Sequence, residues 1–290
     1  MSTTASAPTE VASRAKIGAV DLAYTLTGKP GKTPVMMIMG FMMPGRAWRF
    51  IVPELAADRQ VCTFDNRGAG ESSVPGEAWT MADMAGDVRD LMDHLGWDKA
   101  HIVGVSMGGM IAQVFALDYT DRAASLTLIA THAGGRFAIV PPLGGLVPFV
   151  RANLLSRVKD PEGVRRRYRA LSKLLFTRSF LASNEEAHLE ALLRHDFEPA
   201  PPADGKKAQL GAIMKHRTAS RLKGLSGLAT LIIKPAADLL VSPSHSERLH
   251  RMIPGSRLVT IEDAGHGLVR QVPGNLAREI HAHIVGAEPA

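Results

Sequence analysis

The 290-residue sequence predicts an α/β protein with a mostly parallel, eight-stranded sheet covered by helices on both faces. Two observations lead to this prediction. Short and nearly continuous apolar runs, typical of strands buried on both faces, alternate with helical patterns along most of the chain. The alternation stops between about 137 and 228, where the patterns are helical throughout, which indicates a helical cap inserted between two core strands.

Eight strands can be assigned in order. Residues 16–28 are expected to form an antiparallel pair at a sheet edge, after a disordered terminus (residues 1–15) rich in Ser, Thr, Ala and Pro. Six further runs have the length and apolar character of buried strands: PVMMIM (34–39), QVCTFD (60–65), AHIVGV (100–105), SLTLIA (125–130), TLIIKP (230–235) and RLVTIE (257–262). The core then comprises residues 16–136 and 229–290, and the cap comprises residues 137–228.

Helix boundary signals support this order. Residues 80–96 begin at a Thr cap with Asp83 three residues on, a variant of the capping box, and end at a Gly. Residues 242–255 have a Ser cap, a Pro at the first helical position and a Pro-Gly end. Four stretches of the cap have helical patterns: VPFVRANLLSRV (147–158), EGVRRRYRALSKLL (162–175), NEEAHLEALLRH (184–195) and GKKAQLGAIMKHRTASRL (205–222).

The composition excludes several classes of protein. The longest apolar run, at 137–150, is too short and too rich in Pro and Gly to span a bilayer. The first residues lack the apolar block of a secretory signal. Cys62 is the only cysteine and lies in an expected strand, which excludes a disulfide framework and a cysteine-based zinc site. A soluble cytoplasmic protein is therefore expected.

Positive charge is concentrated in the cap. The net charge is +6, and residues 140–228 hold 16 Lys and Arg against 8 Asp and Glu, so this segment carries +8 and the remainder carries −2. The RRRYR stretch at 165–169 is compatible with a solvated helix face, an acidic substrate or a membrane surface. Nucleic-acid binding is disfavoured because aromatic residues make up only 5% of the chain and no recognised module is present. The oligomeric state stays open.

A serine framed by glycines follows the expected strand 100–105. In GVSMG (104–108), Ser106 stands between this strand and an expected helix, which fits a sharp turn that exposes the hydroxyl at the carboxyl edge of the sheet. Crowding in such a turn explains Gly104 and Gly108. The Met107 N–H then points to where a substrate carbonyl oxygen would lie, at the positive end of the helix. The flanking elements favour this interpretation over a merely glycine-rich strand end.

Three further motifs accompany this serine in a fixed order. DNRGAGES (65–72) looks like a tight turn after a core strand, KPAADLLVSP (234–243) like a turn that carries an acid, and DAGHG (263–267) like a loop that carries a base. Together with GVSMGG they make the sequence resemble the α/β-hydrolase superfamily over about residues 16–286. The resemblance implies a serine esterase or lactonase with an inserted cap, distantly similar to bacterial methyl-esterases that act on polyketide products.

His266 is the best candidate for the base that activates Ser106. It follows the last expected strand in a loop with a glycine on either side, which should leave it free to swing. His132, in the loop after strand 125–130, is the alternative. The other nine histidines open a strand or fall in helical patterns, where solvated or capping roles are expected: His94, His101, His188, His195, His216, His245, His250, His281 and His283.

Asp238 is the candidate for the acid that orients His266 by accepting a hydrogen bond from its second ring nitrogen. It follows the expected strand that ends at Pro235, where relatives usually have Gly. Some relatives carry this acid in the loop that reads THAGG (131–135) here, and that loop has no carboxylate. Two further carboxylates are close in sequence to the base but are expected to be solvated or capping residues: Glu262 and Asp263.

A second oxyanion donor is expected in the loop Met39-Gly40-Phe41-Met42. Relatives commonly have His-Gly there, and Met39 replaces the histidine, so the support of this loop must differ. The resemblance assigns the donor to Phe41 N–H, while Gly40 allows the backbone to approach. The apolar side chains in this loop predict an apolar substrate pocket, with Gly40, Met42 and Met43 as substrate-binding residues.

The predicted reaction is ester hydrolysis through an acyl-enzyme. Ser106 attacks the carbonyl carbon, His266 takes and returns the proton, Asp238 holds the ring, and the Phe41 and Met107 N–H groups stabilise the oxyanion. No metal or organic cofactor is required. The same residues could instead open a lactone or enol-lactone or cleave a carbon–carbon bond. A binding protein on a hydrolase scaffold that has lost turnover is the alternative from another class.

Overall fold

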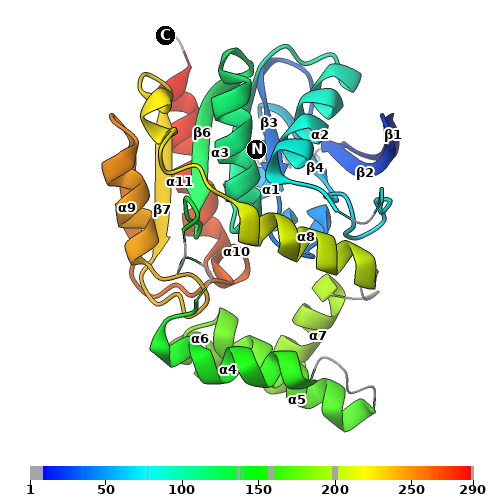
Figure 1. The fold of residues 1–290 in the computed structure, drawn as a ribbon, viewed down its shortest axis with the longest axis vertical. Helices are drawn as coiled ribbons and strands as arrows, with labels where there is room; N and C mark the ends of the chain where they lie inside the picture. Colours follow the sequence, from blue (N-terminus) through cyan, green and yellow to red (C-terminus); the bar gives the residue numbers. More distant parts are fainter. Residues whose placement is uncertain are drawn as a thin grey trace, which may run out of the picture.

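The computed structural model describes residues 9–76, 78–135, 138, 140–155, 160–197 and 202–288. The strands in this part of the chain are β1 (Glu10–Ile17), β2 (Val20–Thr27), β3 (Lys32–Ile38), β4 (Arg59–Phe64), β5 (Ala100–Val105), β6 (Ala123–Ile129), β7 (Thr230–Pro235) and β8 (Arg257–Ile261). They form one sheet in the order β1-β2-β4-β3-β5-β6-β7-β8 (Figure 1). β2 is antiparallel to β1 and β4, and the other neighbouring strands are parallel. The predicted fold class is confirmed.

The amino-terminal edge of the sheet differs from the prediction. Residues 10–15, which the sequence assigned to a disordered terminus, belong to β1 and pair with β2 along its whole length. The expected antiparallel pair is present, with Gly18 at φ 54° in the turn, but it starts at Glu10. An edge strand satisfies its backbone by pairing and keeps polar side chains in solvent, so β1 has little apolar signal in its sequence. Residues 1–8 lie outside the described residues.

Helices cover both faces of the sheet (Figure 1). Those outside the insertion are α1 (Val52–Leu55), α2 (Met81–His94), α3 (Met107–Asp118), α9 (Ser244–Met252), α10 (Leu268–Gln271) and α11 (Pro273–Ala287), with 3-10 turns at Gly45–Trp48 and Thr120–Arg122. A further 3-10 turn, Leu222–Leu225, lies at the end of the insertion, just before β7. Successive residues of a strand point to opposite faces of the sheet. In β3, Met36 belongs to the apolar cluster that includes α2 and α3, and Met37 belongs to the cluster that includes α1 and α11. Cys62 is also fully buried, which raises the pKa of its thiol. Nowhere in the described part of the chain is a helix both long and apolar enough to cross a bilayer.

Two helix starts test the boundary signals. Thr80 caps α2 as predicted, since its hydroxyl accepts from Asp83 N–H (3.2 Å) and the Asp83 carboxylate accepts from Thr80 N–H (2.7 Å). α9 begins one position later than predicted. Pro243 occupies its N-cap without a side-chain cap, and the hydroxyls of Ser242 and Ser244 bond to each other instead (2.9 Å).

The segment between β6 and β7 forms helices, but only part of it stands apart from the core. It contains α4 (Leu143–Leu154), α5 (Pro161–Leu175), α6 (Arg178–Ala182), α7 (Glu186–Phe197) and α8 (Ala203–Lys215). α4 to α7 lie beyond the carboxyl ends of the parallel strands (Figure 1). The segment from α5 to α7 has its own apolar cluster: Tyr168, Phe176, Leu189 and Leu193. α8 packs on the main core through Ala208 and Ala212. Residues 216–221, expected to continue its helix, are not helical.

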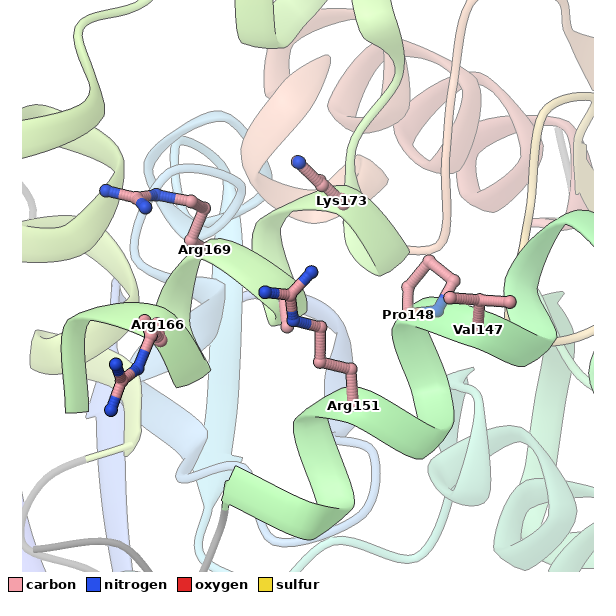
Figure 2. A pocket seen from close by; sticks show the side chains of 7 residues that line it. Val147, Pro148, Arg151, Arg166, Arg169 and Lys173 are labelled. Carbon is pink, nitrogen blue, oxygen red and sulfur yellow. The ribbon is translucent and has the colours of Figure 1, made fainter. Parts of the chain in front are cut away.

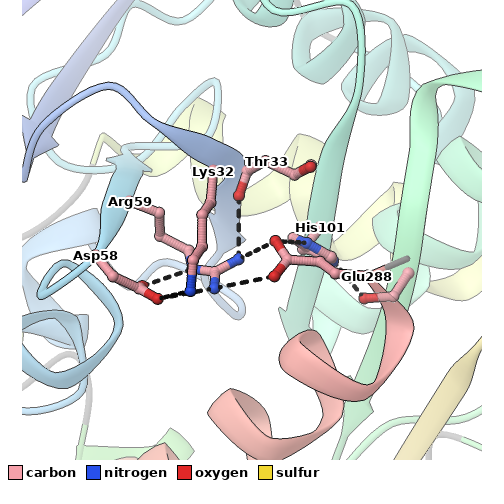
Figure 3. Close-up of polar contacts among 7 residues, drawn as sticks. Lys32, Thr33, Asp58, Arg59, His101 and Glu288 are labelled. Carbon is pink, nitrogen blue, oxygen red and sulfur yellow. Dashed lines mark hydrogen bonds and ion pairs between the residues drawn. The ribbon is translucent and has the colours of Figure 1, made fainter. Parts of the chain in front are cut away.

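The opposite end of the sheet holds an ionic network around a buried arginine (Figure 3). Arg59 is fully buried at the start of β4 and donates to Glu288 Oε1 (2.7 Å), Asp58 Oδ1 (3.0 Å) and Thr33 O (3.3 Å). His101, at the start of β5, lies 3.5 Å from the same Glu288 oxygen, and burial lowers the pKa of His101 to about 4. The network fixes the segment after α11 to the amino ends of the central strands, away from the carboxyl edge.

Candidate active site

Ser106 occupies a strained turn between β5 and α3. Its φ is 56°, a left-handed value that side-chain-bearing residues rarely adopt. Ser106 N–H donates to Ile129 O (2.8 Å), and Thr131 Oγ1 donates to Ser106 O (2.7 Å). β6 and the loop after it therefore hold the strained backbone in place, and the serine lies at the carboxyl edge of the sheet.

Close packing explains the glycines around this serine. A Cβ on Gly104 would lie 2.3 Å from Gly108 O, and a Cβ on Gly108 would lie 2.1 Å from Ile38 O in β3. Gly40 faces the serine from the other side, where a Cβ would lie 3.2 Å from Ser106 Cβ. Any larger residue at 104 or 108 would force the strand and helix apart and move the hydroxyl.

Three loops bring their side chains together at this point. His266 Nε2 lies 3.1 Å from Ser106 Oγ, and His266 Nδ1 lies 2.7 Å from Asp238 Oδ2. With its proton on Nδ1, the imidazole donates to the carboxylate and accepts from the serine hydroxyl. Asp238 Oδ1 accepts the backbone N–H groups of Leu240 (2.7 Å) and Val241 (2.8 Å). Hydrogen bonds thus compensate the burial of this carboxylate, which is 2% exposed.

The alternative base lies elsewhere. His132 Nδ1 accepts from Gly134 N–H (3.0 Å), and its ring packs 5.5 Å from that of His245 and 6.2 Å from that of His216. Burial, reinforced by His216, lowers the pKa of His132 to about 3, so it is neutral near pH 7. His216 and His283, for which solvated or capping roles were expected, are both buried, and His216 occupies the C-cap of α8. Burial also lowers the pKa of His216, to about 4.

The acid turn closes without the glycine that relatives have. Pro235 ends β7, and Ala237 N–H donates to Ala264 O (3.0 Å), so the acid loop is bonded directly to the base loop. Asp263 does not contact the imidazole. Its carboxylate accepts from the Ser179 hydroxyl of α6 (2.6 Å), which agrees with the peripheral role expected from the sequence.

The base loop is anchored to the insertion. Gly267 N–H donates to Leu175 O at the end of α5 (2.8 Å). A Cβ on Gly265 would lie 2.4 Å from Leu175 O, and one on Gly267 would lie 2.6 Å from the Phe176 ring. These glycines therefore permit close packing. The expectation that they leave His266 free to swing is wrong.

Sequence reasoning missed the two side chains that support the loop after β3. Asn66 Nδ2 donates to Met39 O (2.9 Å), and Gln209 Oε1 accepts from Met42 N–H (2.9 Å). Met42 has φ 59°, so this loop also contains a strained residue. Gln209 is fully buried, and its Nε2 donates to Arg67 O (2.8 Å). One amide therefore joins α8, the loop after β3 and the turn after β4.

α8 reaches this loop because two glycines face each other. A Cβ on Gly205 would lie 2.3 Å from Gly68 O, and one on Gly68 would lie 2.9 Å from Gly205 Cα. The backbones of α8 and the 65–72 turn therefore touch, and Gln209 follows one helical turn later. The replacement of histidine by Met39 was the only sequence signal that another support exists, and it did not indicate which residue provides it.

Two backbone N–H groups near the serine are candidate oxyanion donors. Neither Phe41 N–H nor Met107 N–H donates to another group within the described residues. The Met107 side chain is fully buried, Met42 is 5% exposed, and Met43 packs half-buried against the core. In the same part of the chain, no three His, Cys, Asp or Glu side chains are arranged to hold a metal ion.

Known proteins share both the sequence pattern and the fold. Residues 33–269 match the family model described as alpha/beta hydrolase fold. The chain is 28% identical to "Putative carbamate hydrolase RutD" of Caulobacter vibrioides, covering 94% of this chain and 99% of the relative, and 28% identical to rhodomycin D methylesterase DnrP of Streptomyces peucetius, covering 88% and 92%. A thermophilic esterase from Thermogutta terrifontis has a TM-score of 0.77 at 28% identity, covering 97% and 99%. The enol-lactonase from Burkholderia xenovorans LB400 shares the fold with a TM-score of 0.79 at 23% identity, covering 94% and 100%. This protein therefore belongs to the α/β hydrolase fold family.

Proposed function

We propose that this protein hydrolyses a carboxylic ester through an acyl-enzyme on Ser106. The hydrogen-bonded chain from Ser106 Oγ through His266 to Asp238, with separations of 3.1 and 2.7 Å, carries the proposal. It supplies a nucleophile, its base and the group that orients the base. Membership of a hydrolase family and similarity to a methylesterase and an esterase support an ester as the substrate.

In the first half of the reaction, Ser106 Oγ attacks the ester carbonyl carbon while its proton moves to His266 Nε2. Asp238 stabilises the imidazolium through the Nδ1–H bond. Phe41 and Met107 N–H groups donate to the developing oxyanion, and each such donor typically contributes about 10²–10³ in rate. The C–O bond of the ester then breaks, and His266 Nε2–H protonates the departing alcohol.

In the second half, water attacks the acyl-enzyme. His266 Nε2 accepts a proton from the water as its oxygen bonds to the acyl carbon, and the same two N–H groups hold the oxyanion. The bond between the acyl carbon and Ser106 Oγ then breaks, Ser106 Oγ recovers its proton from His266 Nε2, and the carboxylic acid leaves. Gly40 keeps the backbone close to the serine, while Met42 and Met43 are proposed to line an apolar acyl pocket.

Carbamate hydrolysis is the second candidate, because the RutD relative aligns with 94% of this chain and its name specifies that reaction. A carbamate and an ester present the same carbonyl geometry to Ser106. Nitrogen donates electron density to the carbamate carbonyl, so attack on it is slower. The two reactions therefore differ in rate with one leaving group, which makes them separable in a single assay.

Two measurements test the proposal. A fluorophosphonate probe should label the wild-type protein and not Ser106→Ala, and absence of labelling in folded wild type would favour a binding protein without turnover. Hydrolysis of p-nitrophenyl esters with short to long acyl chains should exceed that of p-nitrophenyl carbamates. Labelling without hydrolysis of any ester would redirect the assignment to carbamates, lactones, enol-lactones or carbon–carbon bonds.

A further inference from the structure

α4 presents its large apolar side chains to solvent. Leu143, Leu146, Val147, Val150 and Leu154 are between 42% and 88% exposed. Their spacing of three, one, three and four residues places them on one stripe of the helix. Large contiguous apolar patches are rare on monomeric soluble proteins and mark interaction sites.

The opposite face of the same helix makes its closest contacts through small residues. Gly145 lies against the backbone of Leu239, where a Cβ would be 1.7 Å from Leu239 O, and Ala152 is 6% exposed. Larger side chains would not fit at these contacts. α4 therefore cannot rotate to bury its leucines without losing its contact with the loop that carries Asp238, and the apolar stripe must face outward.

A cationic groove, lined in part by Val147 of the apolar stripe, lies next to α4 (Figure 2). It has a volume of about 330 Å³ and lies between α4 and α5, and its lining combines apolar and basic residues: Val147, Pro148, Arg151, Arg166, Arg169, Ala170 and Lys173. Arg169 pairs with Glu186. Within the described residues, no carboxylate lies at ion-pair distance from Arg151, Arg166 or Lys173, so three cations in the groove are not neutralised.

We propose that the apolar stripe of α4 and the adjoining cationic groove bind a membrane surface with anionic headgroups. Leucine and valine side chains would enter the boundary between headgroups and acyl chains, while the groove holds phosphate groups. The unneutralised cations favour an anionic membrane over a second copy of this protein as the partner. A second copy of the chain would bring the same cations together, whereas an anionic bilayer satisfies both the apolar stripe and the charge.

This binding does not depend on hydrolysis. Its determinants are exposed residues of α4 and α5, and in the described part of the chain no side-chain hydrogen bond or ion pair joins them to Ser106 or His266. Ser106→Ala is therefore expected to bind vesicles as the wild type does, so failure of the esterase proposal and failure of the membrane proposal would be seen in separate assays.

Vesicle flotation tests the proposal. The wild-type protein should float with phosphatidylcholine vesicles that contain phosphatidylglycerol, bind pure phosphatidylcholine more weakly, and lose binding as salt rises. Arg151→Gln with Arg166→Gln should weaken binding by about 25-fold, at about five-fold for each cation near an anionic surface. Leu143→Ser with Leu154→Ser should lower binding to both kinds of vesicle.

Matched variants away from this surface serve as controls. Val285→Ser and Lys207→Gln remove an exposed apolar side chain of α11 and an exposed cation of α8, and both should bind as the wild type does. Equal flotation with neutral and anionic vesicles, or equal binding by the stripe, groove and control variants, would overturn the proposal. So would a dimer in sedimentation that Leu143→Ser with Leu154→Ser converts to a monomer.

Discussion

Replacing Gln209 with leucine tests whether α8 positions the loop after β3, which carries the proposed oxyanion donor Phe41 N–H. Gln209 is fully buried, accepts from Met42 N–H and donates to Arg67 O. Leucine has a similar size but neither polar group, so the buried Met42 N–H and the partly buried Arg67 carbonyl would lose their partners. At about 1–3 kcal/mol for each unsatisfied group, the free energy of unfolding should fall by about 2–6 kcal/mol. Because the free energy of unfolding of a protein is typically about 5–15 kcal/mol, the variant should be assayed at low temperature, where it stays folded.

The larger effect is expected in the reaction. The Gln209 bond fixes Met42 at φ 59° and, through it, the direction of Phe41 N–H. Complete loss of one oxyanion donor costs about 10²–10³ in rate, and a loosened donor should lower kcat by about ten-fold or more within that limit. KM should change less, because the oxyanion forms only after substrate is bound.

Gln209→Glu refines the test because the replacement has the same shape. A protonated carboxyl can accept from Met42 N–H and donate to Arg67 O, whereas an ionised one cannot donate. Burial raises the pKa of such a carboxyl. The ratio of variant to wild-type kcat for p-nitrophenyl ester hydrolysis should therefore fall as pH rises through that pKa. Leu210→Ala, a half-exposed position on the same helix, should keep wild-type kcat. A Gln209→Leu protein with lowered Tm and wild-type kcat would refute a positioning role.

Three further predictions follow from buried polar groups. Asp238→Asn keeps an acceptor for the two backbone N–H groups but turns an amide toward His266, so kcat should fall by about 10⁴ with little change in Tm. Asp196 lies at the contact between α7 and α10, is 1% exposed and accepts two hydrogen bonds from Arg270 (2.6 and 2.7 Å). Burial alone would raise the pKa of Asp196, but Arg270 holds this pKa below its ordinary value. Asp196→Asn leaves that guanidinium buried without a counter-charge, and urea unfolding should show a loss of about 3–5 kcal/mol. The pKa of His132 is about 3 against an ordinary 6.5, so its contribution to stability is complete above pH 6.5 and declines as pH falls toward 3; His132→Asn retains an acceptor and should flatten this decline in unfolding measured from pH 7 to pH 4.

Each of these predictions has an outcome that contradicts it. Wild-type kcat in Asp238→Asn would exclude this carboxylate from orienting the base. For Asp196, the control is Glu186→Gln at an exposed ion pair, where a loss of about 0–1 kcal/mol in the free energy of unfolding is expected. Equal losses in the two variants would show that the buried pair contributes no more to stability than the exposed one. If the free energy of unfolding of His132→Asn fell with pH as steeply as that of the wild type, groups other than His132 would be responsible for the loss of stability in acid.

Local patterns in the sequence predicted the centre of the fold best. The ranges expected for β5 and β7 coincide with the observed strands because both strands are buried on both faces and read as continuous apolar runs. Ser106, Asp238 and His266 were identifiable because each lies in a short motif at or just beyond the carboxyl end of a core strand. The first six residues of β1, 10–15, were missed because an edge strand needs hydrogen bonds more than apolar side chains.

The sequence by itself therefore predicted the fold class, a helical insertion and the serine, histidine and aspartate that the structure joins by hydrogen bonds. Only the tertiary structure decided that Gln209 supports a loop 167 positions away, and that glycine contacts fix the base loop against α5. It also decided that α4 turns its leucines outward. Periodicity reports that a residue lies on one face of an element, but the partner of that face depends on how closely distant backbones approach, and no local pattern encodes that distance.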